Sequence, residues 1–309
     1  MIGAFFRIIR YPNLLMIIFI QYIVRYCLVK PVLAIEGIPL QMSELNFALL
    51  VLSTVLITAA GYVINDYFDL RIDRINKPDK IILGKKISRR KAILIHTIFS
   101  LFGILLGFYV AFSVGAIKLG FINAVITVLL WFYSAKYKQK FLIGNVIVSI
   151  LSAFVIIIVW LFEFFALIKS GTMFFTASKS IFIYIMAYAA FAFLITLIRE
   201  IIKDIEDIKG DSITGCRTVP IVLGVQRTKL FINILAGVCV VFLVYILVDL
   251  YDLELFRYSL FLLIGLYLYL IVKVQLAKEK DDFIFLSSFT KIIMIAGILT
   301  MQIIYINLY

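Results

Sequence analysis

Long apolar runs, almost free of charged residues, recur along the whole 309-residue chain and leave few folds open to it. A helix needs roughly 20 mostly apolar residues to cross the hydrocarbon core of a bilayer. Because backbone groups in lipid must be hydrogen-bonded within the protein, these runs predict helices, and the alternation typical of β-barrel strands is absent. The segments that are long enough to span are residues 13–34, 45–65, 92–112, 116–134, 142–167, 180–202, 229–249, 257–275 and 285–309.

These nine segments predict an all-α, polytopic membrane protein. Only 16% of the residues are charged, against about a quarter in ordinary soluble domains, which excludes a domain of that kind. No linker or low-complexity tract divides the chain. We therefore expect one integral-membrane domain over residues 1–309.

The basic residues predict how the chain is oriented. When Lys and Arg near a span end are assigned to the adjoining loop or terminus, the segments on one side hold 23 of them and those on the other side hold 5. Cytoplasmic loops of membrane proteins carry such an excess. We expect a location in the cell membrane, contact with membrane lipids, a cytoplasmic N-terminus and an external C-terminus. The net charge of +12 reflects this orientation, and we expect no nucleic-acid partner.

The acidic residues are concentrated where two apolar segments meet basic loops. Nine of the 18 lie in two short stretches, NDYFDLRIDRINKPD (65–79) and REIIKDIEDIKGD (199–211). On a helix with 3.6 residues per turn, Asn65, Asp69 and Asp73 fall within about 80° of arc, so they line one face. A solvated helix end has no need of such a one-sided arrangement.

The second stretch gives a similar stripe. On a continuous helix Asp204, Asp207 and Asp211 fall within about 60° of arc. Like charges at these separations destabilise an isolated helix, so we expect a cation to lie between them.

Carboxylate and amide oxygens are hard ligands of the kind that Mg²⁺ prefers, and Mg²⁺ often completes its shell with substrate phosphates. The candidate metal ligands are Asn65, Asp66, Asp69, Asp73, Asp204, Asp207 and Asp211. The basic residues that could hold phosphate oxygens beside the metal are Arg71, Arg74, Lys77, Arg199 and Lys203. Together they predict a site for a magnesium–diphosphate complex, and no glycine-rich nucleotide loop is present.

The two stretches also indicate an internal repeat. Each follows the second of four apolar segments, and short basic loops recur at corresponding places. We therefore expect a bundle of two four-helix repeats plus a final helix, with the two acidic stripes facing each other across a central cavity.

The two motifs resemble those of the UbiA-type intramembrane prenyltransferases. NDYFDLRID (65–73) is similar to the Asn-x-x-x-Asp-x-x-x-Asp signature of this family, and the INKP that follows resembles its continuation. DIEDIKGD (204–211) contains the second element of the family, Asp-x-x-x-Asp, as Asp207 and Asp211.

Two shorter matches extend the resemblance, which covers about residues 7–230. RYPN (10–13) resembles an Arg-Pro-x-Asn element near the first helix, which makes Arg10 and Asn13 candidate substrate-binding residues. YSAKYK with the GN that follows it resembles the junction between the fourth and fifth helices.

The resemblance implies nine helices around a central cavity and transfer of a prenyl group from a polyprenyl diphosphate to an acceptor. It implies Mg²⁺ as the cofactor, held by Asn65, Asp69, Asp73, Asp207 and Asp211, the four aspartates being the catalytic carboxylates. It implies diphosphate contacts from Tyr133, Lys138, Arg199 and Lys203, to which the residue pattern adds Arg74 and Lys77.

The second motif is most similar to that of the family branch that prenylates geranylgeranylglyceryl phosphate, so we expect this lipid as the acceptor and ether lipid synthesis as the role. The loop after NKP departs from the family pattern: it reads DKIILGKK, with Lys80 in place of Arg and no second proline. Likewise, no proline follows Arg10 directly. An aromatic quinone precursor, of the 4-hydroxybenzoate or naphthoate type, therefore stays open as the acceptor.

Two other classes of membrane protein share part of this pattern of repeats and acidic residues. Secondary transporters also contain repeats and intramembrane charges, but their carboxylates usually lie near the midplane on broken helices. The acidic stretches here lie at helix ends, and the adjoining spans contain no proline. CDP-alcohol phosphotransferases collect their aspartates in one stretch rather than two. Both alternatives are disfavoured.

Overall fold

The computed structural model describes residues 2–76, 78–172, 175–249 and 254–308. Almost all of these residues are helical, and the only β pairing among them is an isolated bridge between Leu83 and Ile87. In chain order the elements are α1 (Ile2–Ile8), α2 (Tyr11–Ile23), the π-helix η1 (Val24–Val29), α3 (Lys30–Ile35), α4 (Glu44–Asn76), η2 (Pro78–Lys80), α5 (Arg89–Ser113), η3 (Ile117–Leu119), α6 (Gly120–Ala135), η4 (Tyr137–Gln139), α7 (Ile143–Ser170), α8 (Phe175–Glu206), α9 (Ile208–Ile213), α10 (Val219–Leu223), α11 (Val225–Asp249), α12 (Glu254–Leu276) and α13 (Lys280–Leu308).

The predicted spans are confirmed in number and place. The described part of the chain contains nine helices that are long and apolar enough to cross a membrane, and the first of them joins α2, η1 and α3 into Tyr11–Ile35. The second predicted segment ended at residue 65, whereas α4 continues to Asn76. The first acidic stripe is therefore part of the membrane-spanning helix itself.

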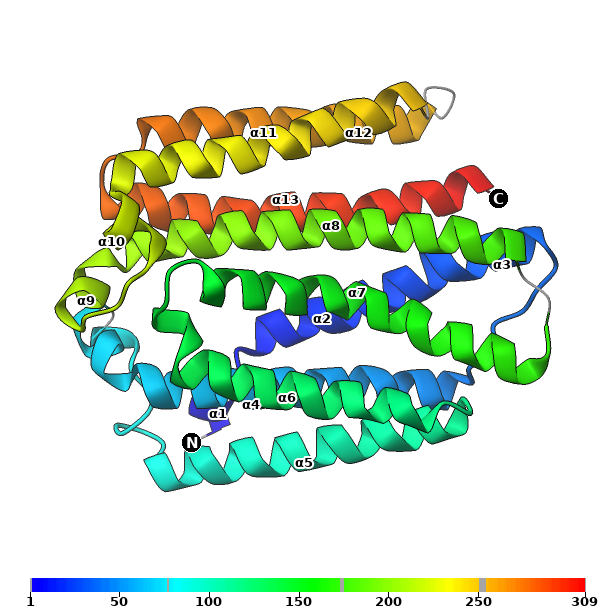
Figure 1. The fold of residues 1–309 in the computed structure, drawn as a ribbon, viewed down its shortest axis with the longest axis horizontal. Helices are drawn as coiled ribbons and strands as arrows, with labels where there is room; N and C mark the ends of the chain where they lie inside the picture. The colour runs from blue at the N-terminus through cyan, green and yellow to red at the C-terminus, as the bar shows by residue number, and fades with distance from the viewer. Residues whose placement is uncertain (1, 77, 173–174, 250–253, 309) are drawn as a thin grey trace.

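The helices run roughly along one axis, and the basic connections collect at one end of the bundle (Figure 1). α9, α10 and the connections α4–α5, α6–α7 and α12–α13 lie at the left end of the view, whereas α3 and the α5–α6 connection lie at the right end. The segments with the excess of Lys and Arg thus share one end, as the charge pattern predicts. We call this the basic end.

The helices that carry the acidic stretches belong to different groups. α4 packs against α5 and α6, whereas α8 packs against α7 and α13, and α2 and α7 lie between the two groups. α5 approaches α4 closely at Gly103, where a Cβ atom would lie 2.6 Å from Ile57 Cγ1. Small residues allow this close approach in membrane bundles. Because α2 and α7 lie between the two groups, the acidic helices α4 and α8 face each other across the bundle, as the repeat predicts.

A buried ion pair stabilises the end of the helix bundle that lies opposite to the basic end. Arg25 in η1 donates to Glu163 Oε2 of α7 at 3.0 Å, and both side chains are only 1% exposed. Glu163 also accepts from the backbone N–H groups of Gln41 (2.5 Å) and Met42 (3.1 Å). The loop between α3 and α4 is thus held against α7 by charge-assisted hydrogen bonds, which are roughly twice as strong as neutral ones.

Candidate functional site

A cavity of about 1430 Å³ runs between the two helix groups. Side chains from α2, α4, α6, α7, α8, α11, α12 and α13 line it, and apolar residues predominate away from the basic end. The predicted site residues that line it are Arg10, Asn13, Asn65, Asp66, Asp69, Asp73, Tyr133, Lys138, Arg199, Lys203 and Asp207. The fold therefore brings most of the two acidic stretches and their basic neighbours to one space, although these residues are up to about 200 positions apart in sequence.

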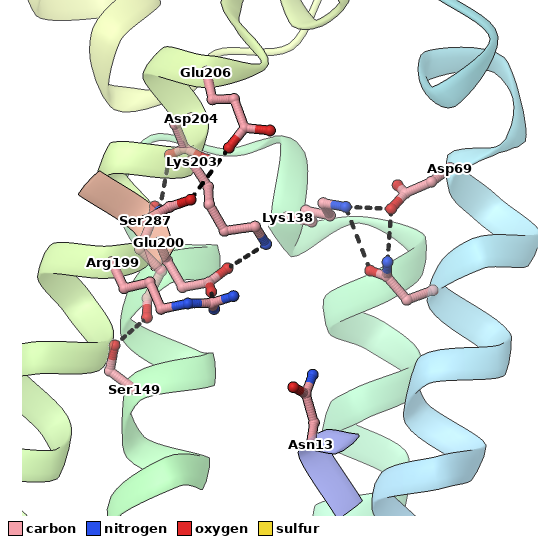
Figure 2. Close-up of polar contacts among 12 residues, drawn as sticks. Asn13, Asp69, Lys138, Ser149, Arg199, Glu200, Lys203, Asp204, Glu206 and Ser287 are labelled. Atoms are coloured by element: carbon pink, nitrogen blue, oxygen red, sulfur yellow. Dashed lines mark hydrogen bonds and ion pairs between the residues drawn. The ribbon is translucent and has the colours of Figure 1, made fainter. Parts of the chain in front are cut away.

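On the α4 side, Asp69 is the centre of a buried polar group (Figure 2). Asn65 Nδ2, one turn earlier on the same face, donates to Asp69 Oδ2 at 2.7 Å. Lys138 Nζ forms an ion pair with Asp69 and also lies 3.5 Å from Asn65 Oδ1. The predicted helical face is confirmed here, and the cation expected beside its carboxylates is Lys138.

Lys138 reaches this position from η4, a short turn between α6 and α7. The turn lies close to the start of α7 because residue 144 is glycine: a Cβ atom there would be 2.8 Å from the Lys138 Cα. Burial by itself would lower the pKa of the Lys138 ammonium, but the charge of Asp69, the nearby Tyr133 and the hydrogen bond to Asp69 together raise this pKa above its usual range. Lys138 is therefore a permanent cation at neutral pH.

A second cation, Arg10, pairs with Asp66. Arg10 Nη2 donates to Asp66 Oδ1 at 2.8 Å, and the guanidinium lies 4.8 Å from the centre of the Tyr62 ring. The Tyr62 hydroxyl in turn accepts from Asn13 Nδ2 at 3.3 Å. Arg10 has a left-handed backbone (φ 52°), which is costly for a residue with a Cβ atom and is typical of constrained sites. Arg10 and Asn13, the two candidate residues of RYPN, thus both contact the α4 side of the cavity.

On the α8 side, the basic residues surround Glu200 (Figure 2). Arg199 Nη1 donates to Glu200 Oε1 at 2.5 Å, and Lys203 Nζ lies 3.4 Å from Glu200 Oε2. The sequence identified Glu200 as part of the acidic stretch but did not assign it to the site. It is one residue from Arg199 and three from Lys203, so the spacing itself was the available signal.

The prediction that the second acidic stripe lies on one continuous helical face is wrong. α8 ends at Glu206 and α9 begins at Ile208, with a turn at Asp207 between them. Asp207 lines the cavity, whereas Asp204 accepts a 2.8 Å hydrogen bond from Asn145 and lies outside the lining, as does the buried Asp211. The two stripes therefore face each other only in part.

Asn76, the last residue of α4, explains where the α8 helix breaks. Its Nδ2 donates to the Asp207 carbonyl oxygen at 3.0 Å, and its Oδ1 accepts from the Gly210 N–H at 2.9 Å. A Cβ atom at position 210 would lie 2.5 Å from the Asn76 side chain, so only glycine allows this approach. The sequence showed Asn76 within INKP but gave no indication that it joins the two acidic stretches.

The remaining predicted phosphate ligands are less well placed. Arg74 is exposed and does not line the cavity. Lys77 lies outside the described residues.

The carboxylates that line the cavity are the available ligands for Mg²⁺ among the described residues. No three His, Cys, Asp or Glu side chains of the described chain lie close enough together to form a complete metal site. Mg²⁺ does not require one, because it usually takes one or two carboxylates together with water and substrate phosphates. Asp69 and Asp73 on one wall of the cavity and Asp207 on the other meet that need, since all three line the same space. The residues therefore fit a metal that a bound diphosphate would help to hold.

The contact between Asn76 and α9 gives a testable prediction. Asn76→Ala removes two hydrogen bonds that hold the Asp207 turn, each worth about 0.5–1.5 kcal/mol. We expect the amides of α9 to exchange hydrogen faster, measured by mass spectrometry on the detergent-solubilised protein, while α5 and α6 stay protected. Asn233→Ala, which removes a single hydrogen bond to Gln275 on an exposed face, is the control. Unchanged exchange in α9 would show that Asn76 does not hold this turn.

Comparison with known proteins adds to these observations. Among curated relatives, the chain is 36% identical over 179 residues to a Methanosphaera stadtmanae protein named digeranylgeranylglyceryl phosphate synthase. This match covers 58% of each chain, so it spans less than two thirds of that relative's length.

Solved structures share the fold. A structure described for digeranylgeranylglyceryl phosphate synthase in membranes has a TM-score of 0.65 at 24% identity and covers 99% of each chain. A UbiA homologue from Archaeoglobus fulgidus bound to DMAPP and Mg²⁺ has a TM-score of 0.56 at 16% identity, over 97% of this chain and 99% of that one. The profile of the UbiA prenyltransferase family matches residues 32–295, from within α3 into α13. The chain therefore belongs to the UbiA prenyltransferase family.

Proposed function

We propose that the protein is a magnesium-dependent prenyltransferase that transfers a prenyl group from a polyprenyl diphosphate to geranylgeranylglyceryl phosphate. The observation that carries this proposal is the composition of the cavity. Carboxylates from α4 and from the α8–α9 turn share it with several cations, among them Arg10, Lys138, Arg199 and Lys203, and the rest of its lining is mainly apolar. A charged diphosphate with a long apolar chain matches that division.

The cations would bind the diphosphate and stabilise the charge that develops on it. As the allylic C–O bond breaks, the leaving diphosphate takes the bonding electron pair, and preorganised positive groups lower the energy of that transition state. Lys138 is suited to this role because its pKa keeps it protonated. Mg²⁺ held by Asp69, Asp73 and Asp207, with Asn65 beside them, would supply further electrophilic stabilisation of the leaving group. Asp211 and Asp204 would act through the turn that carries Asp207.

The apolar part of the cavity would hold the prenyl chain and keep water from the allylic carbon. Exclusion of water matters because a reactive carbocation would otherwise be hydrolysed. The hydroxyl oxygen of the acceptor then forms the new C–O bond with that carbon, and the hydroxyl proton leaves to solvent or to the diphosphate. The product is an ether.

The acceptor is proposed from the relatives. The Methanosphaera stadtmanae protein is named as a digeranylgeranylglyceryl phosphate synthase, and the α8 side of the cavity is rich in cations. A glycerol that carries one ether and one phosphate has a single free hydroxyl, which would be the nucleophile. An aromatic acceptor of the 4-hydroxybenzoate or naphthoate type carries one carboxylate in place of the doubly charged phosphate, so it would make less use of several cations.

We also propose that the basic end of the bundle faces the cytoplasm. The charge bias between the two sides and the placement of the basic connections at one end support this orientation. Truncated fusions that end after Gln139, Lys209 or Lys280 should place a reporter in the cytoplasm. A fusion at the C-terminus should place it outside, and a cytoplasmic signal there would contradict the proposed orientation.

Transfer should depend on Mg²⁺ and on one carboxylate from each wall of the cavity. We expect Asp69→Asn and Asp207→Asn each to lower turnover by about 10²-fold or more, since each removes a ligand of the complex that stabilises the leaving group. Asp281→Asn, at the exposed start of α13, is the matched control. Product formation is measured by mass spectrometry in detergent, with Mg²⁺ and with excess chelator. Full wild-type turnover in chelator would contradict the metal requirement.

The acceptor is decided by competition. The wild-type protein receives geranylgeranyl diphosphate, Mg²⁺ and equal amounts of geranylgeranylglyceryl phosphate and 4-hydroxybenzoate. We expect the lipid ether as the only major product. A product formed only on the aromatic acid would reject the lipid acceptor and leave the prenyl transfer in place.

A further inference from the structure

Lys291 is an isolated charge on the last membrane-spanning helix. After Asp282 it is the only charged residue up to the end of the chain. It lies eleven residues into α13, about 16 Å from the loop-facing start of the helix. An ionisable residue at such a depth is rare and usually faces a polar interior rather than lipid.

Lys291 belongs to the lining of the cavity. Its helical neighbours Ile284, Ser287, Met294 and Ile298 line the same space, so one face of α13 forms a wall of the cavity. Within the part of the chain that the structure describes, Lys291 makes no hydrogen bond and no ion pair. A cation that lines a cavity without a protein partner is placed to meet a ligand.

The charges around Lys291 are mostly of its own sign. Arg199 and Arg10 repel it, and Glu200 attracts it. Glu200 is already engaged by Arg199 and Lys203.

Arg199 also has an unused donor. Its Nε is buried and has no hydrogen-bond partner. Arg199 lies seven residues before the end of α8, about 10 Å from that end, and it is the cation that repels Lys291 most strongly. Lys291 on α13 and the Nε of Arg199 on α8 thus both offer hydrogen-bond donors that have no partner among the described residues.

The α4 side differs from this arrangement. There Arg10 is paired with Asp66 and Lys138 with Asp69. On the α8–α13 side the carboxylates Glu200, Glu206 and Asp207 also line the cavity, but Lys291 forms no ion pair with any of them among the described residues, so a bound anion would balance its charge.

We propose that Lys291 and Arg199 form a second anion subsite, which binds the phosphate of the acceptor. The inference rests on the proposed function and deepens it, because it assigns the acceptor's phosphate to Lys291, which the proposed function does not use, and to the Nε donor of Arg199. In the acceptor, the free hydroxyl and the phosphate lie on neighbouring carbons. The phosphate must therefore lie close to the diphosphate when the hydroxyl attacks, and two adjacent anions require two sets of cations.

Substitution of Lys291 tests the subsite. Lys291→Met keeps the length and apolar stem of the side chain and removes the charge. We expect the KM for geranylgeranylglyceryl phosphate to rise about tenfold or more, as loss of a hydrogen bond to a charged group predicts, with the KM for geranylgeranyl diphosphate changed less than twofold. Lys291→Arg should restore most of the affinity. Lys179→Met, an exposed lysine near the start of α8, is the matched control.

A binding measurement separates this inference from the proposed reaction. Geranylgeranylglyceryl phosphate and its dephosphorylated alcohol are titrated into the wild-type, Lys291→Met and Lys179→Met proteins without Mg²⁺ or prenyl diphosphate. Tighter binding of the phosphate form that is lost only in Lys291→Met supports the subsite, even if the wild-type protein forms no product and the proposed reaction fails. Equal binding of both lipids by all three proteins overturns the subsite. An equal rise in both KM values also overturns it, because Lys291 would then serve the diphosphate.

Discussion

Charge compensation in a bundle that largely excludes water is the constraint on which the rest of this structure depends. Two unit charges 4 Å apart interact by about 4 kcal/mol at the effective dielectric constant of a protein surface, and an unpaired charge costs more as water is withdrawn. Asp66 and Asp69 are therefore each held by a cation from another element, Arg10 from the α1–α2 junction and Lys138 from η4. These pairs fix the positions of α2 and η4 against α4, so the charged end of the cavity exists before any ligand binds.

A bound metal–diphosphate complex would replace the partners in these ion pairs with its own charges. Mg²⁺ would take over the carboxylates, and the phosphate oxygens would take over the cations, so opposite charges stay together at every stage. On the α8–α13 side Arg199 and Lys203 both contact Glu200, whereas Lys291 forms no ion pair among the described residues. The two walls of the cavity therefore differ in their electrostatics although both derive from similar helix groups.

The sequence predicted the spans because the length of an apolar run is a local property. It predicted the Asn65–Asp69–Asp73 face for the same reason, since α4 is uninterrupted. The break at Asp207 could not be predicted, because it coincides with hydrogen bonds from Asn76, more than 130 residues earlier. Spacing along one helix contains no information about such a distant contact. The prediction therefore assumed a continuous helix and placed Asp204 and Asp211 in the cavity. The ion-pair partners of Asp66 and Asp69 could not be predicted either, because Arg10 and Lys138 come from elements distant from α4 in the sequence.

The π-helical turn η1 places a constraint on residue number within the first span. An α-helix rotates by about 100° per residue, and a π turn contains one additional residue, so the faces before and after it are offset. Met16 and Ile20, before the turn, line the cavity, whereas Arg25, within it, contacts Glu163 and the α3–α4 loop. One span thus contacts two neighbourhoods in different directions. A deletion of one residue here would leave the span long and apolar enough for the bilayer but would misalign one of its two faces, so insertions and deletions are constrained in η1 even where substitutions are tolerated.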